Sequence, residues 1–393
     1  MSKLEELIQQ YCPDGVEYKP IGDYLKYEQP TKYLVESTKY DDSYPTPVLT
    51  AGQSFILGYT KETDGIYKAS KDSPVIIFDD FTTSLHWVEF SFKVKSSAMK
   101  MLTPVDETKA LFRYLYYCMK NIMYVPGDHT RQWIGTYSQF EIPIPPLPVQ
   151  EEIVRILDAF TELQAELQAE LQKRLQQYKY YRDNLLSFEG RTDVERKKLG
   201  EIATEWYRGA GIKRDEVSEE GYPCIRYGEI HTTYNIWFDE CVSHTDESQQ
   251  PARKYADYGD ILFAITSEDI PFVGNSVAYL GKERILVGGD IVVMKHTQDP
   301  KYMSYVLSTS DAVKQKGKGK VKSKVVHTNV PSLQEIVVPL PSLEEQKRIS
   351  STLDKFYSLL NDLSAGLPAE IEKRRQQYEY YRDKLLTFKR KEA

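Results

Sequence analysis

The sequence predicts an α+β protein in which two mixed α/β domains are joined to two long, repeated helices. Two observations support this fold class. The stretch Gln176 to Phe188 (QQYKYYRDNLLSF) recurs near the end of the chain as Gln376 to Phe388 (QQYEYYRDKLLTF). The long segments that precede the two copies differ in sequence, but their strands and helices are predicted in the same order. A chain of 393 residues also exceeds what a single hydrophobic core usually holds.

The repeat extends well upstream of this stretch. Ile142 to Phe160 matches Val338 to Phe356, and Val16 to Tyr24 resembles Val194 to Ile202 at a somewhat shorter sequence offset. Two tandem halves therefore begin alike and end alike. The predicted organisation is a first domain with an N-terminal helix at 1–145, a first long helix at 146–190, a second domain at 191–338 and a second long helix at 339–393.

The repeated ends are predicted to be long helices with a narrow apolar stripe. Apolar residues recur there mostly at steps of three or four, which is the pattern of a coiled-coil seam. Pro148 marks the start of the first helix, and Ser342 to Glu345 form a capping pattern at the start of the second. Pro368 would interrupt the second helix unless a new helix begins there.

Two such helices most simply bury their stripes against each other, although each helix could instead pack only on its own domain. The stripe residues that we expect to pack between the helices are Leu157, Phe160, Leu163, Leu167, Leu171, Leu175, Tyr178, Leu353, Phe356, Leu363, Leu367, Ile371 and Tyr378.

The two dissimilar middles are predicted as mixed α/β domains. Short apolar runs bounded by turn residues indicate buried strands, and longer segments indicate helices. The predicted strands lie in Asp72–Phe81 and Tyr258–Ile265, and Lys282–His296 is predicted as two strands around a Gly-Gly turn. The predicted helices lie in Glu107–Ile122 and Pro300–Gln315.

Composition restricts the class of protein. The N-terminus lacks the apolar core of a signal peptide, and no segment approaches ~18 consecutive apolar residues, so we expect a cytoplasmic protein with no membrane partner. The four cysteines lack the spacing of a zinc site or a disulfide framework. A net charge of −7 argues against a nucleic-acid partner for the chain as a whole. That argument weakens because part of the acidity falls on the first predicted helix, for example at Glu162, Glu166 and Glu170.

Motifs of catalysis are missing from the sequence. There is no Walker-type phosphate loop, no Gly-x-Gly-x-x-Gly, no Gly-x-Ser-x-Gly and no His-Glu-x-x-His. The Asn-Pro-Pro-aromatic motif of an adenine amino-methyltransferase does not occur either, and the six histidines lack the spacing of metal ligands. We therefore predict no catalytic residue, no metal site and no enzymatic activity for this chain alone.

Basic and polar residues in the middles are candidates for DNA contact. Six lysines occupy every second position from Lys314 to Lys324. In an extended segment they would share one face and could follow a phosphate backbone, while a solvated loop is the alternative. Hydroxyls, guanidinium groups and amides can also reach phosphates or base edges. The full set of candidates is Thr82, Thr83, Ser84, His86, Lys93, Lys95, His129, Arg131, Gln132, Trp133, Arg226, Tyr227, Thr266, Ser267, Lys314, Lys316, Lys318, Lys320, Lys322, Lys324 and His327.

Several repeated motifs together resemble the specificity subunit of Type I restriction–modification systems. The resemblance is carried by the Pro-Leu-Pro segments at 146–148 and 339–341, by EEQKRI at 344–349, and by LPAEIEKRRQQYEYYRDKLL at 367–386 with its partner copy ending in Tyr178 to Asp183. It covers essentially the whole chain. The first copy departs from the family pattern, because VQEEIVRIL stands where Glu-Glu-Gln-Lys-Arg-Ile is expected.

The resemblance implies both an architecture and a function. The middles would be target-recognition domains, and the helices would form an antiparallel coiled coil with pseudo-twofold symmetry, which suits the local twofold symmetry of duplex DNA. Each domain would read one half of a bipartite target. Two methyltransferase subunits and the restriction/translocase subunits would be partners, with S-adenosylmethionine, ATP and Mg on those partners and no cofactor on this chain. A coiled-coil scaffold without sequence-specific DNA reading is the alternative function.

The first predicted helix contains a short repeat of its own. In Glu162 to Gln172 (ELQAELQAELQ) a four-residue unit occurs almost three times. The number of units could set the distance between the two recognition domains. The alternative is that the segment is simply rich in good helix formers.

Overall fold

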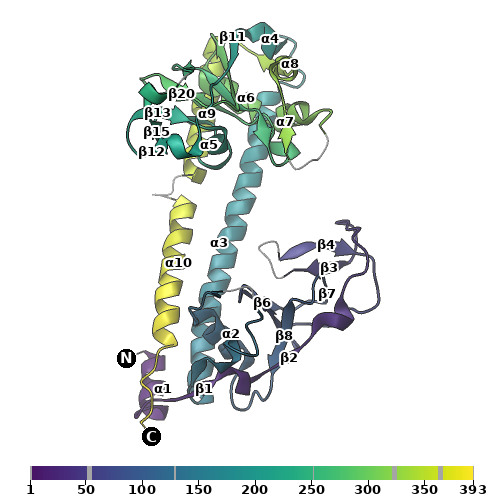
Figure 1. Cartoon of the computed structure of the whole chain (residues 1–393), viewed down its shortest axis with the longest axis vertical. Coiled ribbons are helices and arrows are strands. Elements are labelled where there is room, and N and C mark those ends of the chain that lie inside the picture. Colours follow the sequence, from purple (N-terminus) through teal and green to yellow (C-terminus); the bar gives the residue numbers. More distant parts are fainter. Residues whose placement is uncertain are drawn as a thin grey trace. The chain divides into compact units, whose positions relative to one another are not determined.

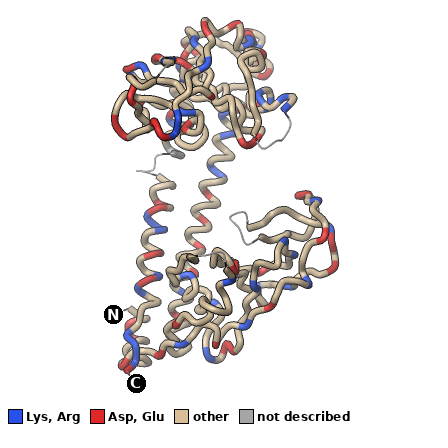
Figure 2. The backbone as a smooth tube through the Cα atoms, viewed as in Figure 1, with Lys and Arg blue, Asp and Glu red and all other residues tan. Residues whose placement is uncertain are grey.

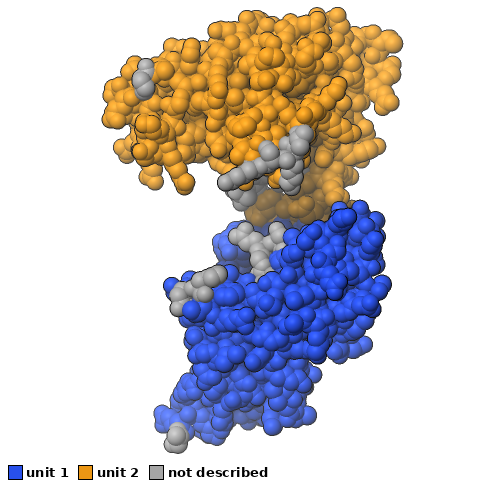
Figure 3. All heavy atoms as spheres, turned by 45° about the vertical axis from the view of Figure 1, so that its right-hand side comes forward, with its two compact units in different colours: residues 1–168, 370–393 blue, residues 169–369 orange. Residues whose placement is uncertain are grey.

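A computed structural model of the chain describes residues 2–50, 55–127, 130–250, 252–320, 325–361 and 366–392, without the side chains of 359–361 (Figure 1). The chain divides into two compact units (Figure 3): unit 1 comprises Met1–Gln168 and Glu370–Ala393, and unit 2 comprises Ala169–Ala369. Helices α3 (Leu147–Ser187) and α10 (Gly366–Leu385) each contribute to both units. Each unit therefore contains one α/β middle together with parts of the long helices.

The α/β middle of unit 1 contains two sheets of more than two strands. One sheet has the order β2-β8-β5-β6, and the other has the order β4-β3-β7. Strand β5 is buried at every position, which explains its continuous Val-Ile-Ile-Phe run. The elements are α1 (Lys3–Tyr11), β1 (Glu17–Pro20), β2 (Leu25–Glu28), β3 (Thr46–Leu49), β4 (Ile56–Thr60), β5 (Val75–Asp79), β6 (Leu85–Val88), β7 (Lys93–Val94), β8 (Met99–Pro104), α2 (Phe112–Asn121) and β9 (Glu141–Ile144).

Unit 2 has a related but larger arrangement. Its sheets have the orders β11-β21-β17-β19-β14 and β12-β15-β13-β20-β16. The strands are β10 (Glu195–Lys198), β11 (Ala203–Arg208), β12 (Val217–Ser218), β13 (Tyr222–Ile225), β14 (Trp237–Phe238), β15 (Ser243–Thr245), β16 (Tyr255–Ala256), β17 (Ile261–Ala264), β18 (Thr266–Ser267), β19 (Ser276–Tyr279), β20 (Ile285–Val287), β21 (Ile291–His296), β22 (Val326–His327) and β23 (Val337–Leu340). The helices are α4 (Leu199–Ile202), α5 (Tyr227–Thr232), α6 (Pro300–Leu307), α7 (Ser310–Gly317), α8 (Val330–Gln334) and α9 (Leu343–Asn361).

The structure refines two predictions for unit 2. The predicted strands on either side of Gly288-Gly289 are confirmed as β20 and β21, but they belong to different sheets and do not pair with each other. The amide of Gly288 donates instead to the carbonyl of Ile225 on β13, at 2.9 Å, which ties the turn to the neighbouring strand. The predicted helix at 300–315 is two helices, α6 and α7, because Ser308 is the C-cap of the first and Thr309 caps the start of the second.

The sequence repeat reappears as a repeated backbone pairing. In unit 1, β1 pairs antiparallel with β9, with Tyr18 opposite Pro143. In unit 2, β10 pairs antiparallel with β23, with Arg196 opposite Pro339. Strand β10 follows β1 at the shorter offset of the sequence repeat, and β23 follows β9 at the longer offset. Each unit therefore closes its α/β middle in the same way, immediately before a long helix begins.

A buried glutamine fixes the start of each long helix. Gln150 and Gln346 are both 0% exposed, and each donates from Nε2 to a proline carbonyl, at 2.7 Å to Pro145 and 2.8 Å to Pro341. Each Oε1 also accepts the backbone amide at the N-cap of the preceding domain helix. The first copy departs from the family pattern but keeps two of its residues: Gln150 corresponds to Gln346, and Ile153 corresponds to Ile349. Helices α3 and α9 begin at matching positions of the repeat.

The long helices run antiparallel within unit 1. Phe160 on α3 packs on Tyr378 and Tyr381 of α10, with ring centroids 6.5 and 5.5 Å apart. Beyond the C-terminal end of α10, the carbonyl of Phe388 accepts a hydrogen bond from Tyr18, whose strand pairs with the one that leads into α3. Along the chain, Tyr378 and Tyr381 of α10 thus lie beside Phe160 within α3, and Phe388 lies further on, beside the strands next to the start of α3. The two helices therefore run in opposite directions. Figure 1 shows α10 beside α3 in this part of the chain.

In unit 2 the partner of α3 is α9. Tyr178 packs on Tyr357, with ring centroids 6.3 Å apart. The pKa of Glu345 is lowered mainly by its hydrogen bond from Arg348. The nearby charge of Arg191 also lowers this pKa, so Arg191 lies close to the start of α9. The two helices again run in opposite directions. Phe356, which we expected in the seam, is 52% exposed, because Tyr357 takes the inward position next to it. Leu363 lies outside the described residues.

The remaining seam residues are at least half-buried. Leu157 and Leu353 are fully enclosed in the cores of units 1 and 2. The half-buried members are Leu163, Leu167, Leu171, Leu175, Leu367 and Ile371. Helix α10 begins at Gly366, so Pro368 lies in its first turn, where proline is tolerated. The second long helix is therefore two helices, as Pro368 allowed.

The predicted fold class is confirmed: the chain combines helices and strands in two domains with long central helices. Within the residues that the structure describes, no helix is both long and apolar enough to cross a membrane. Acidic and basic side chains alternate along α10 (Figure 2), which is typical of solvated helix faces.

Candidate nucleic-acid interface

In unit 1 the turn between β5 and β6 presents three predicted residues, Thr82, Thr83 and Ser84. Asp79 orders this turn, because its Oδ1 accepts the amides of Phe81 at 2.8 Å and Thr82 at 3.1 Å. Thr83 has a φ of 59°, a conformation that a threonine rarely adopts. A β-branched residue held in this region marks a turn whose shape the surroundings enforce. Thr82 is exposed, while Thr83 and Ser84 are half-buried.

A second segment is fastened directly beside this turn. The amide of Gln132 donates to the carbonyl of Asp80 at 2.8 Å, and the amide of Trp133 donates to the Asp80 carboxylate at 2.9 Å. Asp80 is itself buried and lies 3.2 Å from the ammonium of buried Lys100. These bonds hold the exposed side chain of Arg131 next to the turn at Thr82.

Four candidates of unit 1 do not belong to an exposed DNA surface. Gln132 and Trp133 are each 2% exposed, because they anchor the segment that carries Arg131. Lys93 is buried and its ammonium is taken up by Glu62 at 2.8 Å and by the carbonyl of Asp64 at 2.7 Å. His86 is half-buried and stacks on Phe55, with ring centroids 3.9 Å apart, and burial lowers the pKa of His86.

Lys95 is exposed at the end of β7, and His129 lies outside the described residues. The candidates that unit 1 brings together on its surface are therefore Thr82, Thr83, Ser84 and Arg131.

Unit 2 repeats this local construction with other side chains. The amide of Thr328 donates to the carbonyl of Ile265 at 2.9 Å, as Gln132 does to Asp80. This bond and the pairing of β18 with β22 place His327 beside Thr266, with Thr266 Oγ1 and His327 Nδ1 3.1 Å apart. His327 is exposed and follows Arg131 at the same sequence offset that relates the starts of α3 and α9. Arg131 and His327 thus occupy equivalent positions in the two units.

A cavity of about 470 Å³ opens beside His327 in unit 2. The buried candidates Thr266 and Ser267 form part of its wall rather than a free surface. His231 Nε2 lies 2.9 Å from the carbonyl of Thr266, which orients that ring. The lining also includes the predicted Tyr227 and two residues that the sequence reading did not single out, Phe272 and Thr232.

A second cavity, of about 850 Å³, lies on the other side of Tyr227 and is rich in arginine. It is lined by Arg226, which was predicted, and by Arg208 and Arg214, which were not. Arg208 pairs with Asp290 at 2.7 Å and Arg226 with Glu229 at 3.3 Å. Sequence reasoning missed Arg208 and Arg214 because they come from segments far from Arg226 along the chain. The signal in the sequence was Gly209, directly after Arg208, and the structure explains this glycine, because an added Cβ would lie 2.2 Å from the carbonyl oxygen of Gly288.

The described part of the lysine run, Lys314 to Lys320, is not an extended strand. Lys314 and Lys316 lie on α7, because Thr309 caps this helix and Ala312 packs inward. Lys316 is 6% exposed, and its ammonium donates to the carbonyl of Leu307 at 2.9 Å and to Ser276 at 3.3 Å. Burial lowers the pKa of Lys316 to about 7, so this lysine is removed from the DNA candidates. Lys314 and Lys318 are exposed, Lys320 is half-buried, and Lys322 and Lys324 lie outside the described residues.

Over the described ranges, no three His, Cys, Asp or Glu side chains are grouped so that they could hold a metal ion. The four cysteines are free thiols. Burial raises the pKa of Cys118 and of Cys224 to about 12, so neither thiol is suited to act as a nucleophile near neutral pH.

Comparison with known proteins assigns this construction to a family. The family described as "Type I restriction modification DNA specificity domain" matches residues 13–177 and 191–373. The chain is also 43% identical, over 419 aligned positions, to the Type I restriction enzyme EcoR124I/EcoR124II specificity subunit of Escherichia coli. That alignment covers 100% of this chain and 98% of the relative. The chain belongs to the Type I specificity family.

Other relatives of this Type I specificity protein span it equally fully. A putative Type I restriction enzyme specificity subunit of Haemophilus influenzae, S.HindORF215P, is 29% identical over 403 positions and covers 98% of both chains. A solved structure from work on the "complex assembly and conformational transition of the type I R-M system" covers 95% of this chain and 98% of its own, with 15% identity and a TM-score of 0.58. At that identity the likeness concerns the fold.

Family membership settles the class of function. DNA sequence recognition by two domains fits this family, and a coiled-coil scaffold without sequence reading is not favoured. The specificity subunit is a non-catalytic subunit, in agreement with the absence of catalytic motifs from the sequence.

Proposed function

We propose that this chain is the recognition subunit of a Type I restriction–modification complex in which each unit reads one half of a bipartite DNA target. One observation carries the proposal: both units anchor the same surface segment through the same backbone hydrogen bond, but expose a different side chain beside it. Arg131 takes this position in unit 1 and His327 takes it in unit 2. Equal placement with unequal chemistry suits two domains that read different sequences.

The side chains available in each unit suit two kinds of contact. In unit 1, Arg131 can bind guanine with two parallel hydrogen bonds, and the hydroxyls of Thr82 and Ser84 can bind several base edges. In unit 2, Arg226 and Tyr227 line the cavities, His327 contacts Thr266 in the wall of the smaller one, and these three residues would play that part. Lys95 in unit 1 and Lys314, Lys318 and Lys320 in unit 2 would contact phosphates, which fix the register without reading sequence.

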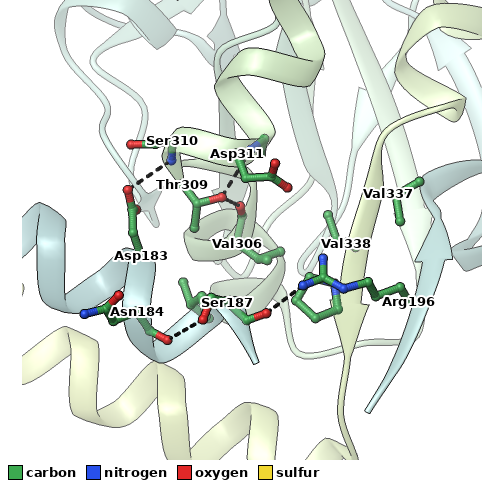
Figure 4. A pocket seen from close by; sticks show the side chains of 13 residues that line it. Asp183, Asn184, Ser187, Arg196, Val306, Thr309, Ser310, Asp311, Val337 and Val338 are labelled. Carbon is green, nitrogen blue, oxygen red and sulfur yellow. Dashed lines mark hydrogen bonds between the residues drawn. The ribbon is translucent and has the colours of Figure 1, made fainter. Parts of the chain in front are cut away.

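The repeated helix ends are the proposed docking sites for two methyltransferase subunits. Tyr180 is 64% exposed and Tyr380 is 62% exposed, at matching positions of the repeated stretch. Beside the first copy lies a cavity of about 330 Å³ (Figure 4), where the Ser310 amide donates to Asp183 at 3.3 Å and Arg196 donates to the carbonyl of Ser187 at 2.7 Å. Large exposed aromatic side chains beside a cavity are typical of interface anchors.

Restriction/translocase subunits would complete the assembly. S-adenosylmethionine, ATP and Mg would then be bound by the methyltransferase and translocase partners, since methylation and cleavage would be theirs. This chain would contribute recognition and the positioning of its partners.

A domain exchange tests the proposal. Residues 16–140 are replaced by the equivalent segment of the E. coli relative, and the complex assembled with its partner subunits is used to enrich random duplexes for sequencing. We expect one half of the enriched target to change while the other half stays the same. A change in both halves, or enrichment of no sequence at all, would contradict the proposal.

A further inference from the structure

Met123 and Val125 project from unit 1 into solvent. They are 97% and 88% exposed, more than any other large hydrophobic residue that the structure describes. Single exposed apolar residues are common on protein surfaces. Two such residues on one short segment, in contact with a candidate recognition site, are not explained by this general tendency. They point to a surface that is covered when the protein works.

The segment that carries them is firmly held. It follows helix α2 (Figure 1), whose last residue is Asn121. Its side chains are alternately half-buried and exposed. Ile122 and Tyr124 pack against the core of unit 1, and the ring of Tyr124 lies 5.2 Å from that of Phe140. Because the inward residues are fixed, Met123 and Val125 are presented outward without freedom to collapse onto the core.

Two further contacts tie this segment to the recognition residues. The hydroxyl of Tyr124 donates to Oε1 of Gln132 at 2.8 Å, next to Arg131 in the chain. The hydroxyl of Thr83 lies 3.5 Å from the carbonyl of Tyr124. Met123 and Val125 therefore share one surface with Arg131 and Thr82. Ile134, three residues after Arg131 in the chain, is 60% exposed as well.

A mixed surface of this kind matches one feature of duplex DNA. In the major groove thymine shows a C5 methyl group next to a hydrogen-bond acceptor, and nearby phosphates attract a cation. Met123 and Val125 supply the apolar contact, Thr82 a hydroxyl, and Arg131 a cation. A protein partner would also accept an apolar pair, but it would not require the adjoining Arg131 and the enforced turn at Thr83.

We infer that Met123 and Val125 contact thymine C5 methyl groups in the half-site read by unit 1, and so help to determine its sequence. The inference rests on the proposed function, since it needs a half-site that belongs to unit 1. The domain exchange described above identifies that half-site first. A chain without a bipartite target would fail at that step, before the methyl contact is tested.

The experiment removes the methyl groups from the DNA. Deoxyuridine replaces thymidine in one half-site at a time, and binding by the assembled complex is measured. Each methyl group that is lost from a buried contact should weaken binding by about fourfold. With the unmodified protein, we expect this loss in the half-site of unit 1. The Met123→Ala/Val125→Ala variant should bind the normal target more weakly and should no longer distinguish thymine from uracil there.

Two controls keep the result specific. Val105→Ala removes an apolar side chain that is 54% exposed elsewhere in unit 1, and it should leave the response to uracil unchanged. Met123→Leu keeps an apolar side chain and should retain part of the preference for thymine. In both variants the opposite half-site should behave as in the unmodified protein.

Three outcomes would overturn the inference. One is a half-site of unit 1 that tolerates uracil fully in the unmodified protein. Another is an equal loss of binding for specific and random duplexes in the double variant, which would make the contact non-specific. The last is unchanged DNA binding with loss of a partner subunit from the purified complex, which would make this surface a protein interface.

Discussion

Tyr305 donates a hydrogen bond of 2.8 Å from its hydroxyl to Oδ1 of Asp354, which joins domain helix α6 to long helix α9. Lys301 donates to the other carboxylate oxygen at 2.6 Å and lies 4.2 Å from the centre of the Trp237 ring. Burial raises the pKa of Tyr305, so this hydroxyl remains a donor throughout the ordinary pH range.

The same group of four side chains recurs in unit 1. Tyr117 donates to Asp158 at 2.5 Å, and Arg113 donates to the same oxygen at 2.8 Å. The guanidinium of Arg113 lies 4.6 Å from the centre of the Trp87 ring. Asp158 and Asp354 stand at matching positions of the sequence repeat. Each recognition domain is thus fastened to its long helix by an aspartate, a tyrosine, a cation and a tryptophan.

Removing one aspartate should loosen one domain only. Asp354→Ala leaves the hydroxyl of buried Tyr305 and the Lys301 ammonium without their partner, at a cost of about 2 kcal/mol of unfolding free energy. Hydrogen exchange of the α6 amides in the full chain should become faster, while the α2 amides in unit 1 keep their protection.

Glu372→Ala is the matched control, because it removes a helix carboxylate that bonds Arg375 at the surface. Such a solvent-exposed pair contributes little to stability, so the protection of α6 should not change. Equal protection of α6 in Asp354→Ala and in the control would show that the aspartate does not fasten the domain.

Lys316 predicts a dependence of stability on pH. Its pKa is about 7 in the folded protein, because it is buried, and roughly 10.4 in an unfolded chain. Between these pH values the unfolded state binds a proton that the folded state lacks, so this group makes the free energy of unfolding rise with pH. Below pH 7 both states hold the proton, and the buried charge costs most.

Lys316→Met should therefore stabilise the protein most below pH 7 and progressively less as the pH rises toward 10. Chemical denaturation of the full chain at several pH values measures the difference between variant and unmodified protein, in which other titrating groups cancel. Lys314→Met, at an exposed site on the same helix, should show no such trend. A stability difference for Lys316→Met that is independent of pH would mean that the lysine charge is not responsible.

Much of the frame could be predicted from the sequence, because its signals are local and repeated. The residues paired in β1 and β9 and those paired in β10 and β23 are related by the same two sequence offsets that relate the repeated segments. The aspartates that fasten the domains fall within the matched Ile-Leu-Asp and Thr-Leu-Asp steps at 156–158 and 352–354. Periodicity likewise located the buried seam residues Leu157 and Leu353.

The site was harder to predict, because burial depends on contacts that are distant in sequence. Lysines normally stay exposed, yet Lys93 and Lys316 are enclosed by segments that the local pattern does not reveal. Helix capping by Thr309 overrides the alternation of the lysine run. Phe356 and Tyr357 are adjacent aromatic residues. Tyr357 is the one that faces inward, because it packs on Tyr178 of the other helix.

The remaining lysines of the run predict a salt effect. Each phosphate that a protein neutralises contributes about −0.9 to the slope of log K against log salt. Replacing Lys314, Lys318 and Lys320 by glutamine should flatten that slope by roughly two to three if all three contact DNA. Binding of specific and random duplexes by the assembled complex should weaken to a similar degree.

Lys316→Met serves as the control here too, because a buried lysine cannot release a counterion and the slope should not change. A slope that is unaltered by the triple replacement would favour a solvated lysine segment without DNA contact.

The last prediction concerns the length of α3, a continuous helix from Leu147 to Ser187 that begins in unit 1 and ends in unit 2. One added Leu-Gln-Ala-Glu unit within Glu162 to Gln172 lengthens a helix by ~6 Å and rotates the rest of the helix by about 40°. The half-buried residues Leu163, Leu167 and Leu171 then stay roughly on one face, so the helix should tolerate the insertion.

Because duplex DNA rises ~3.4 Å per base pair, the unread spacer between the half-sites should widen by about one or two base pairs while both half-sites keep their sequence. Methylation mapping of genomic DNA from cells that carry the insertion measures the spacer. A variant of unchanged length, with Gln164 and Gln168 replaced by lysine, should keep the original spacer, because its helix is no longer than that of the unmodified chain. An active complex whose spacer does not respond to the insertion would show that this segment is only a good helix former.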